Sequence, residues 1–192
     1  MAAQHVPSGR VMGFLSVLEH PEFGLFGGYL LLNWAGRPLE FHCTAPIKPN
    51  RAQEILYGPT LEPFLYGEQI GGTLVGRAKA QALAIFTDRE AALALREGCS
   101  IPTALVLPPE ESPPANGDQR LLRFDGPHAE GPGLTTVRLG RNRLAVPAGF
   151  VEDGRRITEA LADLPESFDL TEPFARIREA IEEAQKAVRS AA

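Results

Sequence analysis

The chain has 192 residues, of which 44% are hydrophobic and 22% are charged, and its formal charge is −5. These values are typical of one folded domain, or of one domain with a small second lobe, and they exclude a chain that is disordered throughout. The 19 glycines and 17 prolines indicate many turns, but the glycines have no period of three, which excludes collagen. We therefore expect a soluble cytoplasmic protein built of many short elements.

The charge balance and the cysteines bear on partners and cofactors. An acidic chain disfavours nucleic acid as a partner, because such modules use clustered Lys and Arg to neutralise phosphates, although a local basic patch would fit the composition. No signal segment opens the chain and no apolar run is long enough to cross a bilayer, so no membrane contact is expected. Cys43 and Cys99 are too few for a four-cysteine zinc site, and the sequence predicts two buried thiols with no metal or other cofactor.

The first part of the chain predicts a three-stranded antiparallel meander. Residues 11–19 and 29–34 form its first two strands, with a turn-rich stretch over 20–28 between them. The third strand, 39–45, alternates between an apolar face that we expect in the core and a polar face. The apolar face holds Leu39, Phe41, Cys43 and Ala45. The polar face holds Glu40, His42 and Thr44.

Two helices are predicted after the meander. Asn50 has the side chain of an N-cap for a short helix over 51–57. A longer helix is predicted over 60–79, either unbroken or broken at Gly71-Gly72. Three glycines along one side of it would let its backbone pack closely on a neighbour, and these are Gly67, Gly71 and Gly76.

A strand, a helix and a second strand then follow in about 25 residues. The strands are predicted over 83–86 and 103–107, and the helix between them over 89–97. This order predicts a right-handed βαβ crossover with two parallel strands. The predicted fold class is therefore α+β, with the meander followed by helices and the βαβ unit.

The rest of the chain predicts a smaller C-terminal lobe. Residues 108–119 contain four prolines and three acids with no large apolar residue, which is typical of a linker or long loop. We expect a main domain over 1–107, this linker, and a β-hairpin plus two-helix lobe over 120–192. The lobe's predicted strands and helices are 121–124, 135–139, 143–146, 153–163 and 172–190.

Few residues carry a catalytic pattern. His42 and Cys43 are neighbours on a strand and point to opposite faces, so they do not predict a thiol–imidazole pair. Asp88 follows a predicted strand, where ligands of open α/β sheets bind, but it also has the position of a helix cap. If the protein is an enzyme, the polar groups that we expect at its site are His42, Glu40 and Asp88.

One candidate anion site lies at a predicted helix N-terminus. Lys48 and Arg51 flank Asn50, and the free backbone N–H groups and the dipole of such a terminus favour negative charge. An ordinary capped helix with solvated basic side chains would give the same pattern.

Two groups of apolar residues fit a surface for a protein partner. The first group is aromatic and lies beside glycine and proline, and its members could equally be residues at the edge of the core. The second is a seam on the last helix with spacings of three and four, which fits packing on its own domain or docking to a partner or second copy. The candidate contacts are Phe23, Phe26, Tyr57, Phe64, Tyr66, Phe174, Ile177 and Ile181.

These observations favour a non-catalytic adaptor or accessory subunit that binds a protein partner or a second copy. The alternative is a small hydrolase or transferase that acts on an anionic substrate near Lys48 and Arg51. A third hypothesis is binding of single-stranded nucleic acid through Tyr57 and Tyr66, which requires a basic groove. The enzyme hypothesis requires His42 and Asp88 to meet at a concave surface.

Overall fold

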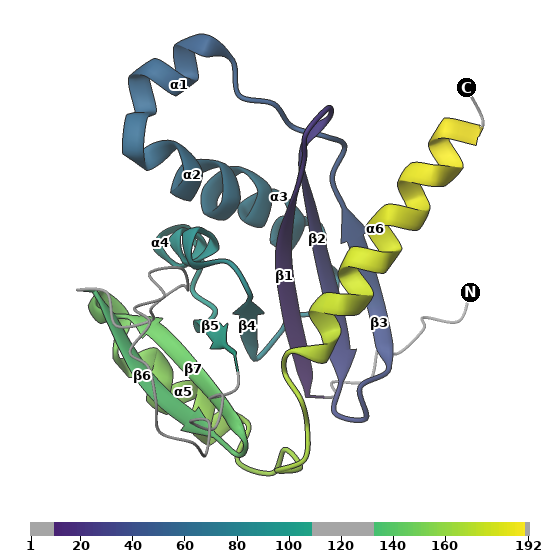
Figure 1. The fold of residues 1–192 in the computed structure, drawn as a ribbon. Coiled ribbons are helices and arrows are strands. Elements are labelled where there is room, and N and C mark those ends of the chain that lie inside the picture. The colour runs from purple at the N-terminus through teal and green to yellow at the C-terminus, as the bar shows by residue number, and fades with distance from the viewer. Residues whose placement is uncertain (1–9, 109–132, 191–192) are drawn as a thin grey trace, which may run out of the picture.

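The computed structural model describes residues 10–108 and 133–190, which form one seven-stranded mixed sheet with helices on both faces (Figure 1). The predicted α+β class is confirmed. The strand order across the sheet is β3-β2-β1-β4-β5-β7-β6. The strands are β1 (Val11–His20), β2 (Gly24–Asn33), β3 (Pro38–Cys43), β4 (Ala84–Thr87), β5 (Thr103–Leu107), β6 (Leu134–Leu139) and β7 (Asn142–Pro147).

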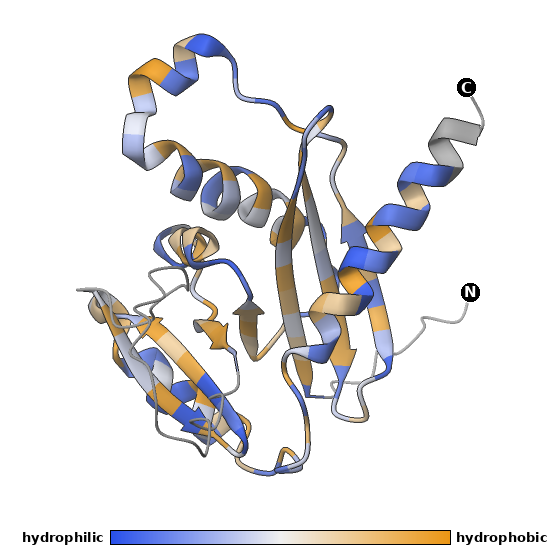
Figure 2. Cartoon of the chain, in the orientation of Figure 1, coloured by the Kyte–Doolittle hydropathy of each residue, from blue (hydrophilic) through white to orange (hydrophobic). Residues whose placement is uncertain are grey.

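The helices divide between the two faces of the sheet. One face carries α2 (Leu61–Pro63), η2 (Phe64–Gly71), α3 (Gly72–Arg77), η3 (Glu90–Ala94) and α4 (Leu95–Gly98). Helix α1 (Arg51–Tyr57) and η1 (Gly58–Thr60) precede α2, and α1 buries none of its residues. The other face carries α5 (Glu152–Ala160), which follows η4 (Ala148–Phe150), and α6 (Glu172–Ser190). Figure 2 shows that hydrophobic residues gather on the central strands between these layers.

Strands β1, β2 and β3 form the predicted antiparallel meander. The prediction of a turn-rich stretch over 20–28 was wrong, because β2 already begins at Gly24, which has a φ of +91°. Two further glycines lie inside β2 because helices press on both faces there. A Cβ on Gly27 would lie 2.1 Å from Ile70 on one face, and a Cβ on Gly28 would lie 2.5 Å from Ile177 on the other.

The predicted faces of the third strand are reversed in the structure. Leu39 and Phe41 are 45% and 38% exposed, and Cys43 is exposed, so the prediction of a core position for this face was wrong. The reason is that β3 is an edge strand and α6 covers it only in part (Figure 1). Cys99, which was predicted as a buried thiol, is half-buried and is also free.

Helix α1 ends at Gly58, which has a φ of +50°, and the chain is then helical from η1 to the end of α3. Asn50 caps α1 as predicted: its side chain accepts from the backbone of Gln53, whose side chain accepts from the backbone of Asn50. The helix does not break at Gly71-Gly72, where a π-helical stretch passes directly into α3. Gly67 allows the predicted close packing, since a Cβ there would lie 2.5 Å from the backbone nitrogen of Leu95.

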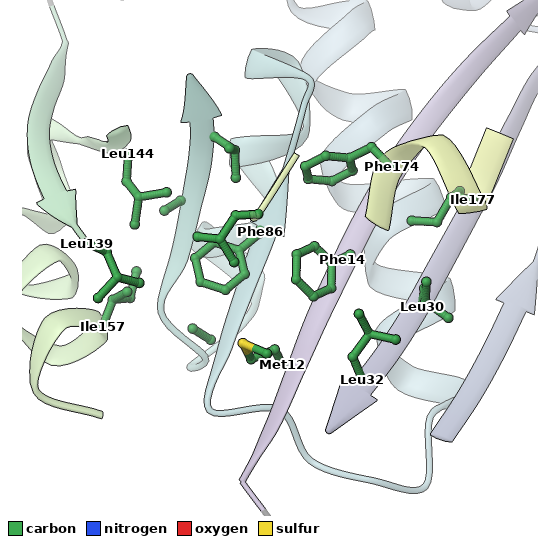
Figure 3. Packing of buried hydrophobic residues seen from close by; sticks show 14 of the residues in the cluster. Met12, Phe14, Leu30, Leu32, Phe86, Leu139, Leu144, Ile157, Phe174 and Ile177 are labelled. Carbon is green, nitrogen blue, oxygen red and sulfur yellow. The ribbon is translucent and has the colours of Figure 1, made fainter. Parts of the chain in front are cut away.

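The predicted βαβ unit is present, and β1, β4 and β5 are parallel neighbours. On the opposite side of the sheet, α6 lies along β1 and β2 (Figure 1). Its Phe174 ring lies 5.7 Å from the Phe14 ring, between centroids, and Ile177 packs beside it (Figure 3). The apolar seam of the last helix therefore packs on its own chain.

The C-terminal hairpin extends the same sheet, because β7 pairs with β5 and β6 pairs with β7. The division into 1–107 and 120–192 stays a prediction. The predicted strand over 121–124 and all of the linker except Pro108 lie outside the described residues. In the part of the chain that the structure describes, no helix is long and apolar enough to span a bilayer.

Candidate functional site

The strand order reverses at the boundary between β1 and β4. Strands β2 and β3 lie on one side of β1 in the sheet, and β4 and β5, which follow later in the chain, lie on its other side. In open α/β sheets, ligands bind outside the carboxyl ends of the strands at such a point. The last β1–β4 pair is Leu15 with Thr87, so the residues just beyond this pair lie at the candidate position.

Two buried oxygens lie beyond this pair on the α6 side. Ser16 is fully buried, and neither its Oγ nor the Oδ1 of Asp88 has a hydrogen-bond partner among the described residues. The other Asp88 oxygen, Oδ2, accepts from Nη1 of Arg178 on α6 at 3.0 Å. Because buried polar atoms are nearly always paired, two unpaired oxygens at a strand end indicate a position that receives a ligand or water.

The α2 side of the same strand ends carries a second set of polar groups. Tyr66 Oη donates to Glu19 Oε1 at 2.5 Å. Burial raises the pKa of Tyr66 well above its ordinary value and the bond to Glu19 raises it further, so the phenol stays a donor. Arg89 lies close enough to act on Tyr66 electrostatically, and its buried Nε lacks a partner within the described part of the chain.

These six residues, Ser16, Glu19, Tyr66, Asp88, Arg89 and Arg178, are called the switch-point cluster below. Ser16, Asp88 and Arg178 belong to the α6 side, and Glu19 and Tyr66 belong to the α2 side, so carboxylates flank the strand ends on both sides. The described residues include no group of three or more His, Cys, Asp or Glu side chains arranged to hold a metal ion.

A second polar hollow lies at the turn of the β6–β7 hairpin. Three arginines, Arg138, Arg141 and Arg143, line a pocket of about 200 Å³, named the arginine pocket below. Its other lining residues are Leu107, Asn142, Asp169 and Thr171. The hydrogen bond from the Thr171 hydroxyl lowers the pKa of Asp169, so this lining residue is ionised near neutral pH.

The predicted catalytic trio is not assembled. His42 Nε2 lies 2.9 Å from Glu40 Oε2 on the edge strand, whereas Asp88 follows β4. Strands β2 and β1 lie between them, so three strand spacings, about 14 Å, separate His42 from Asp88. Glu40 also accepts from the backbone N–H groups of Lys79 at 3.0 Å and Ala80 at 2.7 Å, so it ties β3 to the loop after α3.

The predicted anion site is occupied by contacts within the chain. Lys48 Nζ donates to the carbonyl of Glu22, and Arg51 Nη1 donates to Glu54 Oε2 at 2.9 Å. The Asn50 side chain accepts a hydrogen bond from the backbone N–H of Gln53. The helix that begins there is only seven residues long, so the dipole at its N-terminus attracts an added anion only weakly.

Most of the predicted partner contacts are buried in this chain. The buried ones are Phe26, Tyr66, Phe174, Ile177 and Ile181, which corrects their assignment to a partner surface. Tyr57 stacks on Phe64 with ring centroids 4.3 Å apart, and only Phe23 is exposed. With Tyr66 turned to Glu19, no pair of tyrosines is available to stack on nucleic-acid bases.

Sequence reasoning singled out Asp88 but missed the residues around it. Ser16, Glu19, Arg89 and Arg178 have no local pattern that marks them. The arginine pocket did have a signal, because its three arginines fall within six residues around the turn at Gly140. A hairpin turn brings side chains at its two ends together, so this spacing predicts a compact basic patch.

No family model matches this chain, and no curated protein matches it. Among solved structures, it is similar to two of endonuclease V from Ciona intestinalis, each bound to DNA containing an inosine followed by a ribo-adenosine. The first is 11% identical, with a TM-score of 0.44, and covers 91% of this chain and 86% of that one. The second is 11% identical, with a TM-score of 0.41, and covers 91% and 87%.

This comparison corrects two predictions. The similar structures are of a nuclease on DNA, which contradicts the predicted non-catalytic adaptor and the prediction that disfavoured nucleic acid in favour of a protein partner. We withdraw both and take the function from this chain's own residues.

Proposed function

We propose that this protein is a hydrolase that cleaves phosphodiesters at the switch-point cluster, with nucleic acid as its substrate. The observation that carries the proposal is the environment of Asp88. Its carboxylate pairs with Arg178, a second guanidinium follows it at Arg89, and Oδ1 has no partner in the described part of the chain. The half-exposed Arg178 leaves the group within reach of solvent.

The unpaired atoms match the two reactants of phosphodiester hydrolysis. Arg89 Nε–H needs an acceptor, which a phosphate oxygen supplies, and Asp88 Oδ1 needs a donor, which a water molecule supplies. Asp88 would accept a proton from this water as the water oxygen bonds to phosphorus and the bond from phosphorus to the leaving oxygen breaks, and the leaving oxygen would take a proton from solvent. The guanidinium groups would offset the negative charge that develops on the phosphate oxygens.

Cleavage of labelled oligonucleotides by the purified protein tests the proposal. Single-stranded and duplex DNA and RNA of 20 nucleotides, labelled with fluorescein, would be incubated with the protein and Mg²⁺ and separated on denaturing gels. We expect Asp88→Asn to reduce the cleavage rate by about 10²–10⁴-fold, because general base catalysis contributes that much. The amide keeps the shape of the carboxylate, and a thermal melt checks that the variant is folded.

Asp163→Asn is the matched control. Asp163 is also paired with an arginine, Arg10 Nη1 at 2.5 Å, but it is exposed and its partner precedes β1 at the opposite edge of the sheet. The Asp163→Asn variant should cleave the oligonucleotides at the same rate as the parent. If the parent cleaves none of the substrates, or if Asp88→Asn cleaves as fast as the parent, the proposed activity is wrong.

A cytoplasmic location belongs to the same proposal. Cys43 and Cys99 are both free, as is usual where glutathione and thioredoxin keep thiols reduced.

A further inference from the structure

A hollow of about 460 Å³ opens beside the switch-point cluster, on the α2 side of the sheet. Two members of the cluster, Glu19 and Tyr66, belong to its lining, and His20 and Glu62 are its other ionisable residues. The start of β2, the loop before α1 and the helical segment after α1 supply its apolar walls, which include Leu25, Pro49, Pro59, Leu61 and Leu65. It is called the Tyr66 hollow below.

Two carboxylates lie close to the Tyr66 phenol in this hollow. Glu19 Oε1 accepts from Tyr66 Oη at 2.5 Å. Burial and this bond raise the pKa of Tyr66, and the nearby charge of Glu62 raises it further. Within the described part of the chain, the Glu62 side chain has no hydrogen bond or ion pair, and the Glu19 side chain has only its bond to Tyr66. The hollow therefore offers carboxylate oxygens to the N–H groups of a ligand, and it repels phosphate.

The imidazole of His20 adds one donor to these acceptors. Its Nδ1 accepts from the backbone N–H of Glu22 at 3.1 Å, so the proton of the neutral ring is on Nε2. Nε2–H is thus the group that can donate to an oxygen of a ligand. Apolar walls with a few polar groups at the rim are typical of a site for a flat ring, whose faces pack on the walls and whose edge forms hydrogen bonds.

Arg89 connects the Tyr66 hollow to the proposed site of phosphate binding. Arg89 is extended, with a φ of −124° and a ψ of 116°, and successive side chains of an extended chain point to opposite faces. Asp88 turns to Arg178 on the α6 side, whereas Arg89 lies near Tyr66 on the α2 side. In a nucleotide the sugar joins the phosphate to the base. A phosphate held by Arg89 therefore brings the base of the same nucleotide to the hollow.

We propose that the Tyr66 hollow binds the base of the nucleotide whose phosphate lies at Arg89, and that it prefers guanine. This inference rests on the proposed function, because it names the substrate nucleotide of the same site. The Watson–Crick edge of guanine presents two neighbouring N–H donors, on N1 and N2, beside the acceptor O6. One carboxylate accepts two parallel N–H bonds, and His20 Nε2–H is a donor for O6. At the same edge, adenine, cytosine, uracil and thymine each have a single nitrogen that donates.

Calorimetry with the monophosphates of guanosine (GMP), adenosine, cytidine and uridine tests the inference. We expect GMP to bind at least about tenfold more tightly than the other three, because a second hydrogen bond to a charged group is worth about that factor. Glu62→Gln should weaken GMP binding by about tenfold and leave the others unchanged, since an amide has one acceptor oxygen in place of two. Glu62 is exposed, so the variant should fold, and a thermal melt checks this.

Glu97→Gln is the matched control, because it removes the same charge from another hollow. Glu97 is exposed on α4, and its side chain has no hydrogen bond or ion pair with the described residues. This variant should bind GMP within about twofold of the parent, since only distant, screened charge is lost. Equal binding of all four nucleotides, no binding of any, or unchanged GMP binding by Glu62→Gln would overturn the assignment.

Guanosine and inorganic phosphate, used as competitors of GMP, separate the two ends of the nucleotide. Guanosine should displace GMP from the parent and do so about tenfold less well from Glu62→Gln. Displacement by phosphate alone, with no effect of guanosine, would show that the base is not recognised and would refute the inference.

Cleavage of single-stranded oligonucleotides that carry one guanine at a known position separates this inference from the proposed function. We expect cleavage beside the guanine, and Glu62→Gln should abolish this preference without changing the rate beside other bases. GMP binding that depends on Glu62, with no cleavage of any oligonucleotide, would retain the hollow and refute the hydrolase. Cleavage that depends on Asp88 but is equally fast beside every base would retain the hydrolase and refute the hollow.

Discussion

The buried ion pair between Asp153 and Arg96 fastens α5 to α4 and the edge of β5. Asp153 is 2% exposed and Arg96 is 14% exposed, as side chains. Arg96 Nε donates to Asp153 Oδ2 at 2.5 Å and Nη2 donates to Oδ1 at 3.2 Å, in a two-pronged pair. Arg96 also donates to the carbonyl of Cys99 at 2.7 Å and lies 4.3 Å from the ring centroid of Phe150.

Removal of one partner should destabilise the protein strongly. Asp153→Ala leaves the Arg96 guanidinium buried against an aromatic ring without its counter-ion, which costs about 3–5 kcal/mol. This is a large part of the total stability of a domain, about 5–15 kcal/mol. Replacement of both partners by apolar residues of similar size removes the unpaired charge, so Arg96→Met/Asp153→Leu should cost less than Asp153→Ala alone.

Urea unfolding followed by the fluorescence of Trp34, the single tryptophan, measures these differences. Arg155→Ala is the control, since Arg155 is exposed and pairs only with glutamates of its own helix, and its unfolding midpoint should stay close to that of the parent. An Asp153→Ala variant whose free energy of unfolding lies within about 1 kcal/mol of the parent's would refute this reasoning, because a buried unpaired charge should lower it by more. The reasoning would also be refuted if Arg96→Met/Asp153→Leu were less stable than Asp153→Ala.

Two further predictions concern packing and pH. Gly67→Ala should destabilise by about 1–3 kcal/mol in urea unfolding, because the new Cβ would lie 2.5 Å from the Leu95 backbone, whereas Gly76→Ala, with nothing within 4 Å, should stabilise by about 0.5–1 kcal/mol. Burial alone would raise the pKa of Glu40, but hydrogen bonds, first among them that from the Lys79 backbone, lower it. The charged Glu40 thus stabilises the fold above the ordinary glutamate pKa of about 4.3, and this contribution is lost as pH falls through the lowered value. Glu40→Gln should therefore be less stable than the parent at pH 7, and the gap should narrow below pH 4; an equal gap at both pH values would contradict the assignment.

Local patterns predicted those elements that local forces determine. The cap at Asn50, the parallel strands around 84–87 and 103–107, and the hairpin at Gly140 depend on residues close in sequence. Which face of β3 is buried does not depend on residues close in sequence. Alternation along that strand separates two faces, but only the distant helix α6 and the edge position decide which face is covered, and apolar Phe41 is left partly exposed.

The candidate site depends even more on distant parts of the chain. Asp88 could be singled out because it follows a strand, but its partner Arg178 is 90 residues away. Ser16 reads as one polar residue in an apolar strand, and only the pairing of β1 with β4 brings it level with the end of β4. A site at the reversal of strand order needs that order to be known, and sequence periodicity does not provide it.

The net charge of this chain and the charge at one place on its surface are different quantities. A formal charge of −5 sums the whole surface, whereas phosphate binding depends on the potential at one place, which falls off over about 10 Å at ordinary ionic strength. Residues 138–143 contain three arginines and no acid. The charge of the chain therefore does not determine the potential at a turn such as this one.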